Sequence, residues 1–303
     1  MKQLYGVTVA MITPMDEKGN LDLETLEALT NALIAQGVNC LYPCGTTGEM
    51  TRLSVEERKQ AAETVVRAAA GRVTVFIHIG ADTPADTIEL GIHAAAIGAD
   101  GAGIVTPIFL HASDRELEEY YLEILSQLPE DFPVYLYNIP QCSANDLSSS
   151  SVERIYRQAK NVVGIKYSFL DMNRTAEYLD TDKDFSVLHG SDKFFSSLLV
   201  LGCKGTVSGV AGVFPEPFVA VYDAYIKGNI PEMQKWQSVC RQICDMLKCG
   251  SNMAYFKSGL EFRGISAGHM RSPQKDLTDT EKQALFDALT EFCRKNHIPK
   301  NIV

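Results

Sequence analysis

The chain has 303 residues, of which 46% are hydrophobic and 22% charged, and its formal net charge is −10 at pH 7. This length is enough for one large domain or two ordinary ones, and the composition is close to that of an average soluble globular protein. The acidic balance, without a basic stripe, argues against a nucleic-acid partner. No apolar run is long enough to span a bilayer, and no signal-peptide pattern follows Met1. We therefore expect a cytoplasmic protein with no membrane partner.

Short β-branched runs alternate with stretches in which apolar residues recur at helical spacing. Eight runs are predicted strands, at residues 6–12, 39–43, 73–79, 101–106, 134–137, 162–167, 185–189 and 205–208. The intervening stretches predict helices at residues 23–36, 55–70, 86–97, 114–128, 151–160, 173–179 and 193–201. After residue 212 only helices are predicted, at 215–227, 230–248, 253–262 and 278–295.

Several of these helices have marked starts. Ser54, Ser113 and Thr278 each stand three residues before a glutamate, which is the pattern of a capping box. Thr83 precedes a proline, the combination expected of a cap followed by the first helical position.

Eight alternations of an apolar strand and a helix predict a parallel sheet, and at this length the leading solution is a closed (β/α)8 TIM barrel. A doubly wound open sheet is the alternative, but no Gly-x-Gly-x-x-Gly turn follows the first strand. We assign residues 1–228 to the barrel and residues 229–303 to a C-terminal helical extension of the same domain.

The eight cysteines are scattered along the chain and, at this size, predict reduced cytosolic thiols rather than a disulfide framework. Cys240 and Cys244 would share one helical face, and Cys249 follows them. A zinc site at these three residues is the alternative, but no histidine lies nearby. We predict buried structural cysteines instead.

Polar residues stand at the carboxyl ends of three predicted strands, which meet at one mouth in such a barrel. Lys166 ends an apolar strand, where burial would disfavour its charged form and leave a nucleophilic amine; the alternative is a lysine that extends into solvent. Tyr137 offers a phenol for proton transfer, or is an ordinary mouth tyrosine. Thr46 and Thr47 lie in a glycine-flanked turn that could bind a carboxylate, or is only a turn. Glu49 is a base or, preferably, a buried cap for loop amides.

Three motifs now stand in register: Gly-Thr-Thr-Gly-Glu at 45–49, Tyr-Asn-Ile-Pro at 137–140 and Gly-Ile-Lys at 164–166. In this order and spacing they resemble the dihydrodipicolinate synthase / N-acetylneuraminate lyase family. The resemblance runs from about Leu4 to the C-terminal helices. It implies a (β/α)8 barrel with a helical extension, usually as a homotetramer, and a class I Schiff-base mechanism with no metal or other cofactor.

The resemblance also implies roles for individual residues. Lys166 would form the imine with pyruvate or another 2-keto acid, and Tyr137 and Thr46 would relay protons. The substrate-binding residues would be Thr47 and Gly48, which hold the carboxylate, Val207, which places a backbone carbonyl near the keto acid, and Asp192 and Ser208, which contact its distal portion. His111 is a weaker candidate for the distal portion.

Two positions depart from the synthase members of that family. Where these members carry an arginine that holds the carboxylate of the aldehyde substrate, this chain has Cys142, which cannot make a bidentate contact. Phe109 stands where they borrow a tyrosine from a neighbouring subunit. Both changes fall in one substrate pocket and argue against synthase activity.

The lyase members carry an Asp-Glu pair that binds sugar hydroxyls, and here Asp192 is kept but Lys193 replaces the glutamate. Their serine after the eighth strand aligns with Gly209, beside Ser208. Lys193 indicates a more anionic substrate or is only a surface residue at a helix start.

From these residues we predict a lyase that cleaves or forms a C–C bond in a 2-keto acid, with a 2-keto-3-deoxy sugar acid that releases pyruvate as the favoured substrate. The alternatives are a dehydratase or hydratase using the same imine, N-acetylneuraminate lyase, and a non-catalytic keto-acid sensor. A metal-dependent barrel enzyme is disfavoured because His78 and His93 lack a supporting acidic cluster.

Overall fold

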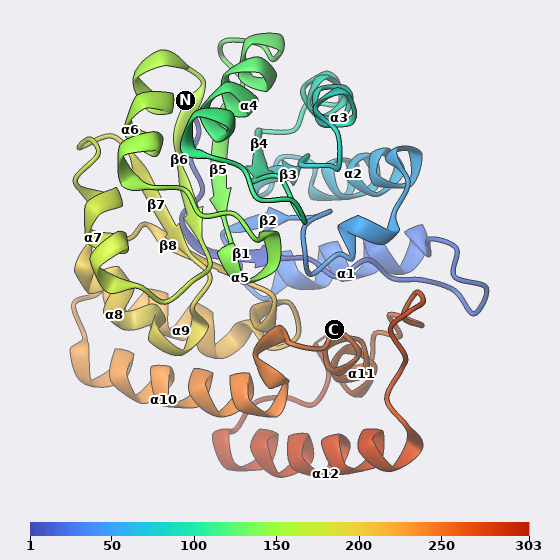
Figure 1. Cartoon of the computed structure of the whole chain (residues 1–303). Helices are drawn as coiled ribbons and strands as arrows, with labels where there is room; N and C mark the ends of the chain where they lie inside the picture. Colours follow the sequence, from blue (N-terminus) through green and yellow to red (C-terminus); the bar gives the residue numbers. More distant parts are fainter. Residues whose placement is uncertain (303) are drawn as a thin grey trace.

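The computed structural model describes residues 1–302 and contains a closed barrel of eight parallel strands in chain order (Figure 1). The strands are β1 (Gly6–Ala10), β2 (Cys40–Tyr42), β3 (Thr74–His78), β4 (Gly101–Val105), β5 (Val134–Asn138), β6 (Val162–Tyr167), β7 (Ser186–His189) and β8 (Gly205–Ser208). All eight predicted strands are present. The barrel closes where Gly6 of β1 pairs with Gly205 of β8, so the open-sheet alternative is wrong.

Helices follow the strands and surround the barrel. They are α1 (Leu23–Ala35), α2 (Val55–Ala69), α3 (Pro84–Ala96), α4 (Asp114–Gln127), α6 (Ser149–Gln158), α7 (Met172–Leu179), α8 (Phe195–Leu201) and α9 (Pro215–Ile226). The predicted helix at 193–201 is in fact the short 3-10 turn η2 (Asp192–Phe194) followed by α8. A four-residue helix, α5 (Pro140–Ser143), was not predicted, because it is shorter than two helical turns and leaves no periodic pattern.

The predicted helix starts are confirmed. Ser54, Ser113 and Thr278 each accept a hydrogen bond from the backbone amide three residues later, and the glutamate side chain there accepts one from the amide of the cap residue. The Thr83 side chain accepts a hydrogen bond from the amide of Asp86. These caps satisfy amide groups that the first helical turn leaves unpaired.

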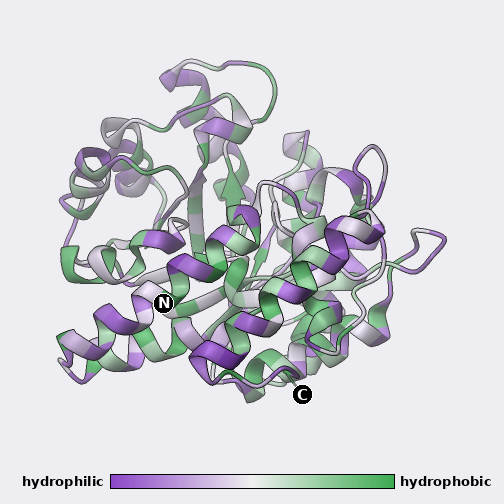
Figure 2. Ribbon diagram, turned by 90° about the horizontal axis from the view of Figure 1, so that it is seen from below, coloured by the Kyte–Doolittle hydropathy of each residue, from purple (hydrophilic) through white to green (hydrophobic). Residues whose placement is uncertain are grey.

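The barrel interior is filled by side chains. One cluster of buried residues from inward-facing strand positions includes Tyr42, Phe76, Tyr135 and Leu188. A second, larger cluster lies between the strands and the surrounding helices. In Figure 2 the strands carry mostly hydrophobic residues, whereas the helices carry both kinds. A packed interior of this kind closes the barrel and leaves the strand ends as the place for a site.

The C-terminal helices lie together on the lower side of the barrel in Figure 1. They are α10 (Ile230–Met246), α11 (Ala254–Phe262) and α12 (Asp279–Asn296), with the turn η4 (Lys248–Gly250) before α11. The backbone amide of Ile302 donates to the carbonyl of Arg263, and the side chain of Gln36, the residue after α1, donates to the carbonyl of Ile302. The end of the described chain thus returns to the barrel, while the boundary after residue 228 stays a prediction.

All eight cysteines are free thiols; Cys240 and Cys244 are buried in α10 and Cys249 is exposed. Within residues 1–302, no group of three or more His, Cys, Asp or Glu side chains is arranged to hold a metal ion. In the same residues, no helix combines the length and the hydrophobicity needed to cross a membrane.

Candidate active site

A cavity of about 410 Å³ opens at the carboxyl ends of the strands. Six of the residues predicted for the site line it: Thr46, Thr47, Tyr137, Lys166, Asp192 and Val207. They come from the segments after β2 and β7 and from β5, β6 and β8 themselves. Barrel topology therefore brings together residues that are up to about 160 positions apart in the sequence.

Lys166 is buried, with only 4% of its surface exposed. Its Nζ lies 3.9 Å from the centroid of the Tyr137 ring and 4.8 Å from that of the Tyr42 ring. No carboxylate of residues 1–302 lies within the 4.0 Å of an ion pair with this amine. The alternative of a lysine extending into solvent is therefore wrong: the amine is held between two aromatic faces, which interact favourably with a cation.

Tyr137 and Thr46 meet beside this amine. The phenolic oxygen of Tyr137 lies 3.4 Å from Oγ1 of Thr46, and either hydroxyl could donate. Tyr137 is the penultimate residue of β5 and pairs in register with Lys166 of β6. Two hydroxyl groups in contact can pass a proton between them, so this arrangement can serve a reaction at the lysine amine.

Tyr42 is a neighbour of Lys166 that the sequence analysis missed. It ends β2, is buried, and its hydroxyl has no hydrogen-bond partner among the described residues. Burial raises the pKa of Tyr42 well above its ordinary value, so its phenol stays protonated. A Cβ at Gly103 would lie 1.9 Å from this hydroxyl, which explains the glycine there. The alternation of inward and outward residues on β2 is the signal that could have identified Tyr42.

Gly48 lies behind the cavity wall and not on it. Its carbonyl accepts a hydrogen bond of 2.8 Å from Oγ1 of Thr13, and its amide bonds to the carbonyl of Gly45. A Cβ at position 48 would lie 3.0 Å from Thr13 Oγ1 and 3.2 Å from the carbonyl oxygen of Met11. Glycine therefore lets the Thr46–Thr47 turn pack closely on the end of β1.

Asp192 faces the cavity, and Ser208 lies behind it. The Ser208 hydroxyl donates to Oδ2 of Asp192 at 2.7 Å, and the Thr206 hydroxyl lies 3.1 Å from Oδ1. The residue is partly exposed, and both oxygens of its carboxyl group lie within hydrogen-bond distance of these hydroxyls. Burial raises the pKa of Asp192 to about 7, although these two hydroxyls and the Lys166 amine favour its ionised form.

The two residues that the sequence predicts to disfavour synthase activity lie in different surroundings. Cys142 of α5 lines the cavity, and Phe109, in the loop after β4, is 87% exposed with a left-handed φ of 75°. His111 of the same loop is exposed and does not line the cavity. Lys193 forms an ion pair with Asp245 of α10 and does not line the cavity, which favours the surface interpretation of that lysine.

The two histidines considered for a metal site are separate. His78 is buried; its Nδ1 lies 3.2 Å from the carbonyl of Cys44, and burial followed by the nearby Arg58 lowers its pKa well below the ordinary value. His93 pairs with Glu63 at 2.9 Å on the outside of the barrel. Neither histidine lines the cavity.

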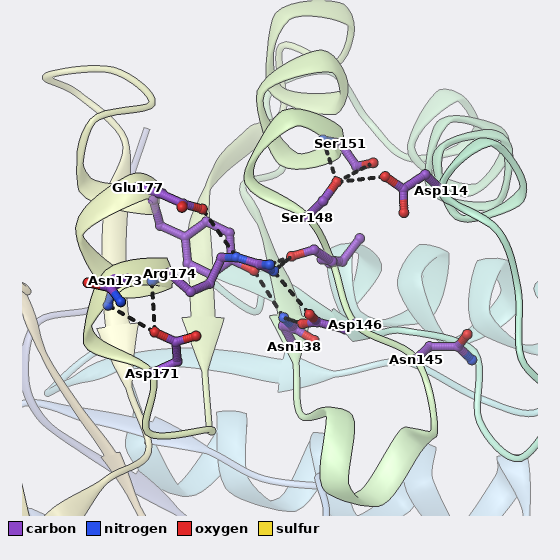
Figure 3. Close-up of polar contacts among 12 residues, drawn as sticks. Asp114, Asn138, Asn145, Asp146, Ser148, Ser151, Asp171, Asn173, Arg174 and Glu177 are labelled. Atoms are coloured by element: carbon purple, nitrogen blue, oxygen red, sulfur yellow. Dashed lines mark hydrogen bonds and ion pairs between the residues drawn. The ribbon is translucent and has the colours of Figure 1, made fainter.

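The Asn138 side chain fixes the end of β5 directly after Tyr137 (Figure 3). Its Nδ2 donates to Oδ1 of Asp146 at 2.7 Å and lies 3.0 Å from the hydroxyl of Tyr178. Arg174 of α7 donates to Oδ2 of the same aspartate at 3.1 Å. This network joins β5, α7 and the segment after α5, and so it supports the backbone that carries Tyr137.

The C-terminal extension forms part of the cavity, which the sequence analysis did not predict. Its lining residues there are Lys248, Cys249, Gly250, Ser251, Met253 and Phe256. Gln141 of α5 donates to the carbonyl of Ser168 at 2.7 Å, and both residues also line the cavity. The distal part of the site is thus shared between α5 and the turn before α11.

Comparison with known proteins gives this arrangement a context. The model of the Dihydrodipicolinate synthetase family matches residues 3–292. A 4-hydroxy-tetrahydrodipicolinate synthase from Methanothrix thermoacetophila is 34% identical over 290 residues, which cover 95% of this chain and 96% of that protein. An uncharacterized DapA-like lyase from Halobacterium salinarum is 33% identical over 289 residues, which cover 95% and 94%. The structure of a sialic acid aldolase from Ruminococcus gnavus, a catalytic lysine mutant, matches with a TM-score of 0.92 at 27% identity, covering 99% of this chain and all of that one.

A closed (β/α)8 barrel with a cavity at the carboxyl ends of its strands is the architecture of a barrel enzyme. The chain belongs to the dihydrodipicolinate synthetase family, as its three motifs indicated, and it is a lyase of the class I aldolase type.

Proposed function

We propose that the protein cleaves or forms a C–C bond in a 2-keto acid through an imine on Lys166. The observation that carries this proposal is the buried amine, 3.9 Å from the Tyr137 ring centroid, beside the Tyr137–Thr46 hydroxyl pair. An imine-forming site needs an amine within reach of the substrate and a partner that moves protons. Both features are present in one cavity.

The proposed reaction begins when the Lys166 amine attacks the C2 carbonyl of the keto acid and water leaves as the imine forms. The protonated imine then accepts the electron pair of the C3–C4 bond as that bond breaks. The proton of the C4 hydroxyl passes to the Tyr137 phenolate, whose own proton has left with the water during imine formation, and an aldehyde departs. The resulting enamine takes a proton at C3, and water hydrolyses the imine to release pyruvate. In this scheme the hydroxyl and the backbone amide of Thr47 hold the carboxylate.

We propose a 2-keto-3-deoxy sugar acid as the substrate, with Asp192 as the acceptor for its distal hydroxyl groups. Ser208 and Thr206 orient that carboxylate, and Gln141 and Ser251 offer further polar groups across the cavity. Cys142 supplies no cation for a second carboxylate, which argues against the condensation that the synthase relatives perform. Appreciable condensation of pyruvate with aspartate semialdehyde by the unaltered protein would overturn this assignment.

The Asp192 carboxyl leads to a pH-dependent prediction. Because an ionised carboxylate accepts hydroxyl hydrogen bonds more strongly than a neutral acid, the KM for a 2-keto-3-deoxy sugar acid is expected to fall as the pH rises through about 7. Asp192→Asn should remove this pH dependence and raise KM about tenfold at pH 8. Initial rates between pH 5.5 and 8.5 would check both expectations, and an unchanged profile in the variant would contradict them.

The same carboxyl also affects stability. Its pKa is raised from 3.8 to about 7 in the folded protein, so the folded state holds one more proton than the unfolded state between these values. Stability contributed by this group is therefore lost as the pH rises through that interval. The Tm of Asp192→Asn should exceed that of the unaltered protein by a few degrees at pH 8, and the difference should shrink toward pH 4.

Borohydride reduction in the presence of pyruvate tests the proposed function directly. An adduct on Lys166, located by intact mass and peptide mapping, is the expected result. If the folded protein gives no adduct with pyruvate or with longer 2-keto acids, the imine mechanism is wrong. Analysis of the products formed from the keto acids that give an adduct then separates two reactions. Cleavage yields pyruvate and an aldehyde, whereas in the dehydratase alternative water leaves and the carbon chain stays intact.

We further propose a cytoplasmic homotetramer. The eight unpaired thiols support a reducing compartment. Apolar side chains near the mouth, Phe109 at 87% and Leu110 at 72% exposed, support burial against a second copy of the chain. Sedimentation equilibrium would measure the assembly, and a monomer at micromolar concentration would contradict the proposal.

A further inference from the structure

Glu49 and Lys257 form a buried ion pair between the turn after β2 and α11. Oε1 of Glu49 lies 2.9 Å from Nζ of Lys257, and their side chains are 1% and 3% exposed. The sequence analysis assigned Glu49 to capping loop amides, but its only amide contact is a long one of 3.4 Å from Arg271. Its main partner is therefore a cation that lies 208 residues away in the chain.

On the barrel side, this pair is attached directly to the predicted catalytic turn. Glu49 has a left-handed φ of 61°, and its amide donates to the carbonyl of Thr46 at 3.1 Å. Only Gly48 separates it from Thr47. A non-glycine residue keeps this backbone conformation only where its surroundings hold it, and the buried carboxylate supplies such a constraint.

On the extension side, the same element reaches the cavity. Phe256, the residue before Lys257 in α11, lines the cavity and lies so close to position 209 that a Cβ on Gly209 would be 2.6 Å from its ring. The Lys257 ammonium also donates to the carbonyl of His269 at 2.6 Å. Burial lowers the pKa of Lys257, and the Glu49 carboxylate opposes that shift. The cation is thus held between the Glu49 carboxylate and a backbone carbonyl of the extension.

Stability alone is a weak reason for such a pair, because two charges lose their hydration on burial and apolar residues of similar size often serve as well. What a buried ion pair does supply is a defined relative position of the two elements that carry it. We propose that Glu49 and Lys257 are positioning residues that hold the Thr46–Thr47 turn in register with the Lys166 amine. This inference rests on the proposed function, since it gives the turn a part in proton transfer and carboxylate binding.

The test uses the exchange of the C3 protons of pyruvate for deuterium, followed by NMR on the full-length protein. This exchange needs the imine and the proton relay but no second substrate. Glu49→Gln keeps the shape of the side chain and removes its charge, and we expect the exchange rate to fall by about 10- to 100-fold with a raised KM for pyruvate. The double variant Glu49→Gln/Lys257→Met carries no charge at either position. Its Tm should return to that of the unaltered protein, whereas its exchange rate should stay low.

Glu216→Gln is the matched control. Glu216 of α9 pairs with the buried Arg263, the residue after α11, so this ion pair also joins the extension to the barrel. Neither residue lines the cavity. Its removal should lower the Tm and leave the exchange rate within about twofold. A merely structural role for Glu49 predicts that both variants behave alike.

The outcomes are distinguishable from failure of the proposed function. An adduct on Lys166 in the unaltered protein, with undiminished exchange in Glu49→Gln, overturns the positioning role and leaves the imine mechanism standing. Absence of both adduct and exchange in the unaltered protein overturns the mechanism, and the positioning role with it. If Glu49→Gln fails to fold, the double variant, which also removes the buried Lys257 charge, decides between the same outcomes.

Discussion

Replacement of Lys166 by alanine is expected to abolish turnover, lowering kcat by at least about 10⁴-fold. The reason is covalent: no other amine of the cavity lies between the aromatic faces beside the Tyr137–Thr46 pair, and without the imine there is no electron sink for the C3–C4 bond pair. Single-turnover assays with the cleavage substrate, together with borohydride trapping, would measure the loss. The mass adduct should disappear with the activity.

The structural cost of this change can be separated from its chemical effect. Lys166 is buried between the rings of Tyr137 and Tyr42, so alanine leaves a void there. Lys166→Met fills most of that space without an amine and replaces a buried polar group by an apolar one, so its Tm should equal or exceed that of the unaltered protein. Both variants should be equally inactive. Substantial turnover in the methionine variant would show that the lysine is not the nucleophile.

The barrel could be predicted from the sequence because its elements obey local rules. Strands such as 162–167 are continuous apolar runs, as expected of strands buried on both faces, and the helix starts at Ser54 and Ser113 follow from side-chain capping. The predicted and observed secondary structures differ at short elements. The helix α5 and the turn η2 each span less than two helical turns, so neither shows a periodic pattern of apolar residues in the sequence. Both nevertheless carry residues that line the cavity.

The keto-acid half of the site could be predicted because parallel strands end at one mouth, which brings Thr46, Tyr137 and Lys166 together whatever lies between them in sequence. The distal half of the site could not be predicted in this way. Phe256 and the turn at 248–251 reach the cavity only through the packing of the extension, and no local pattern encodes that docking.

The charged residues of the distal half also could not be placed from the sequence alone. Lys193 and Asp192 are adjacent in sequence, and the replacement of an acidic residue by Lys193 suggested an anionic substrate. In the structure the Lys193 amine turns outward to Asp245, while the Asp192 carboxyl turns inward to Ser208. The side of the cavity wall on which a charge lies depends on partners in α10 and β8, which are distant in sequence.

Tyr137→Phe is the second change for which a large effect is expected. Removal of the phenolic oxygen 3.4 Å from Thr46 Oγ1 should lower kcat by about 10²- to 10³-fold, the usual contribution of a positioned acid–base group, while the lysine can still form its imine slowly. Borohydride trapping should therefore still label Lys166. Deuterium exchange at C3 of pyruvate should fall in parallel with kcat, because that step is a proton transfer.

Tyr135→Phe provides the matched comparison, since Tyr135 lies two residues earlier on β5 and is also buried. Its hydroxyl donates to Oγ of Ser186 at 2.8 Å and accepts from the amide of Leu4, within the packed barrel interior and away from the cavity. Loss of this hydroxyl should cost about 1 kcal/mol of stability and leave exchange unchanged. If the two variants lost the same activity, the effect would come from packing in β5. A selective loss in Tyr137→Phe would place the proton on the phenol next to Lys166, because the two tyrosines share the strand and the burial and differ in which hydroxyl reaches the cavity.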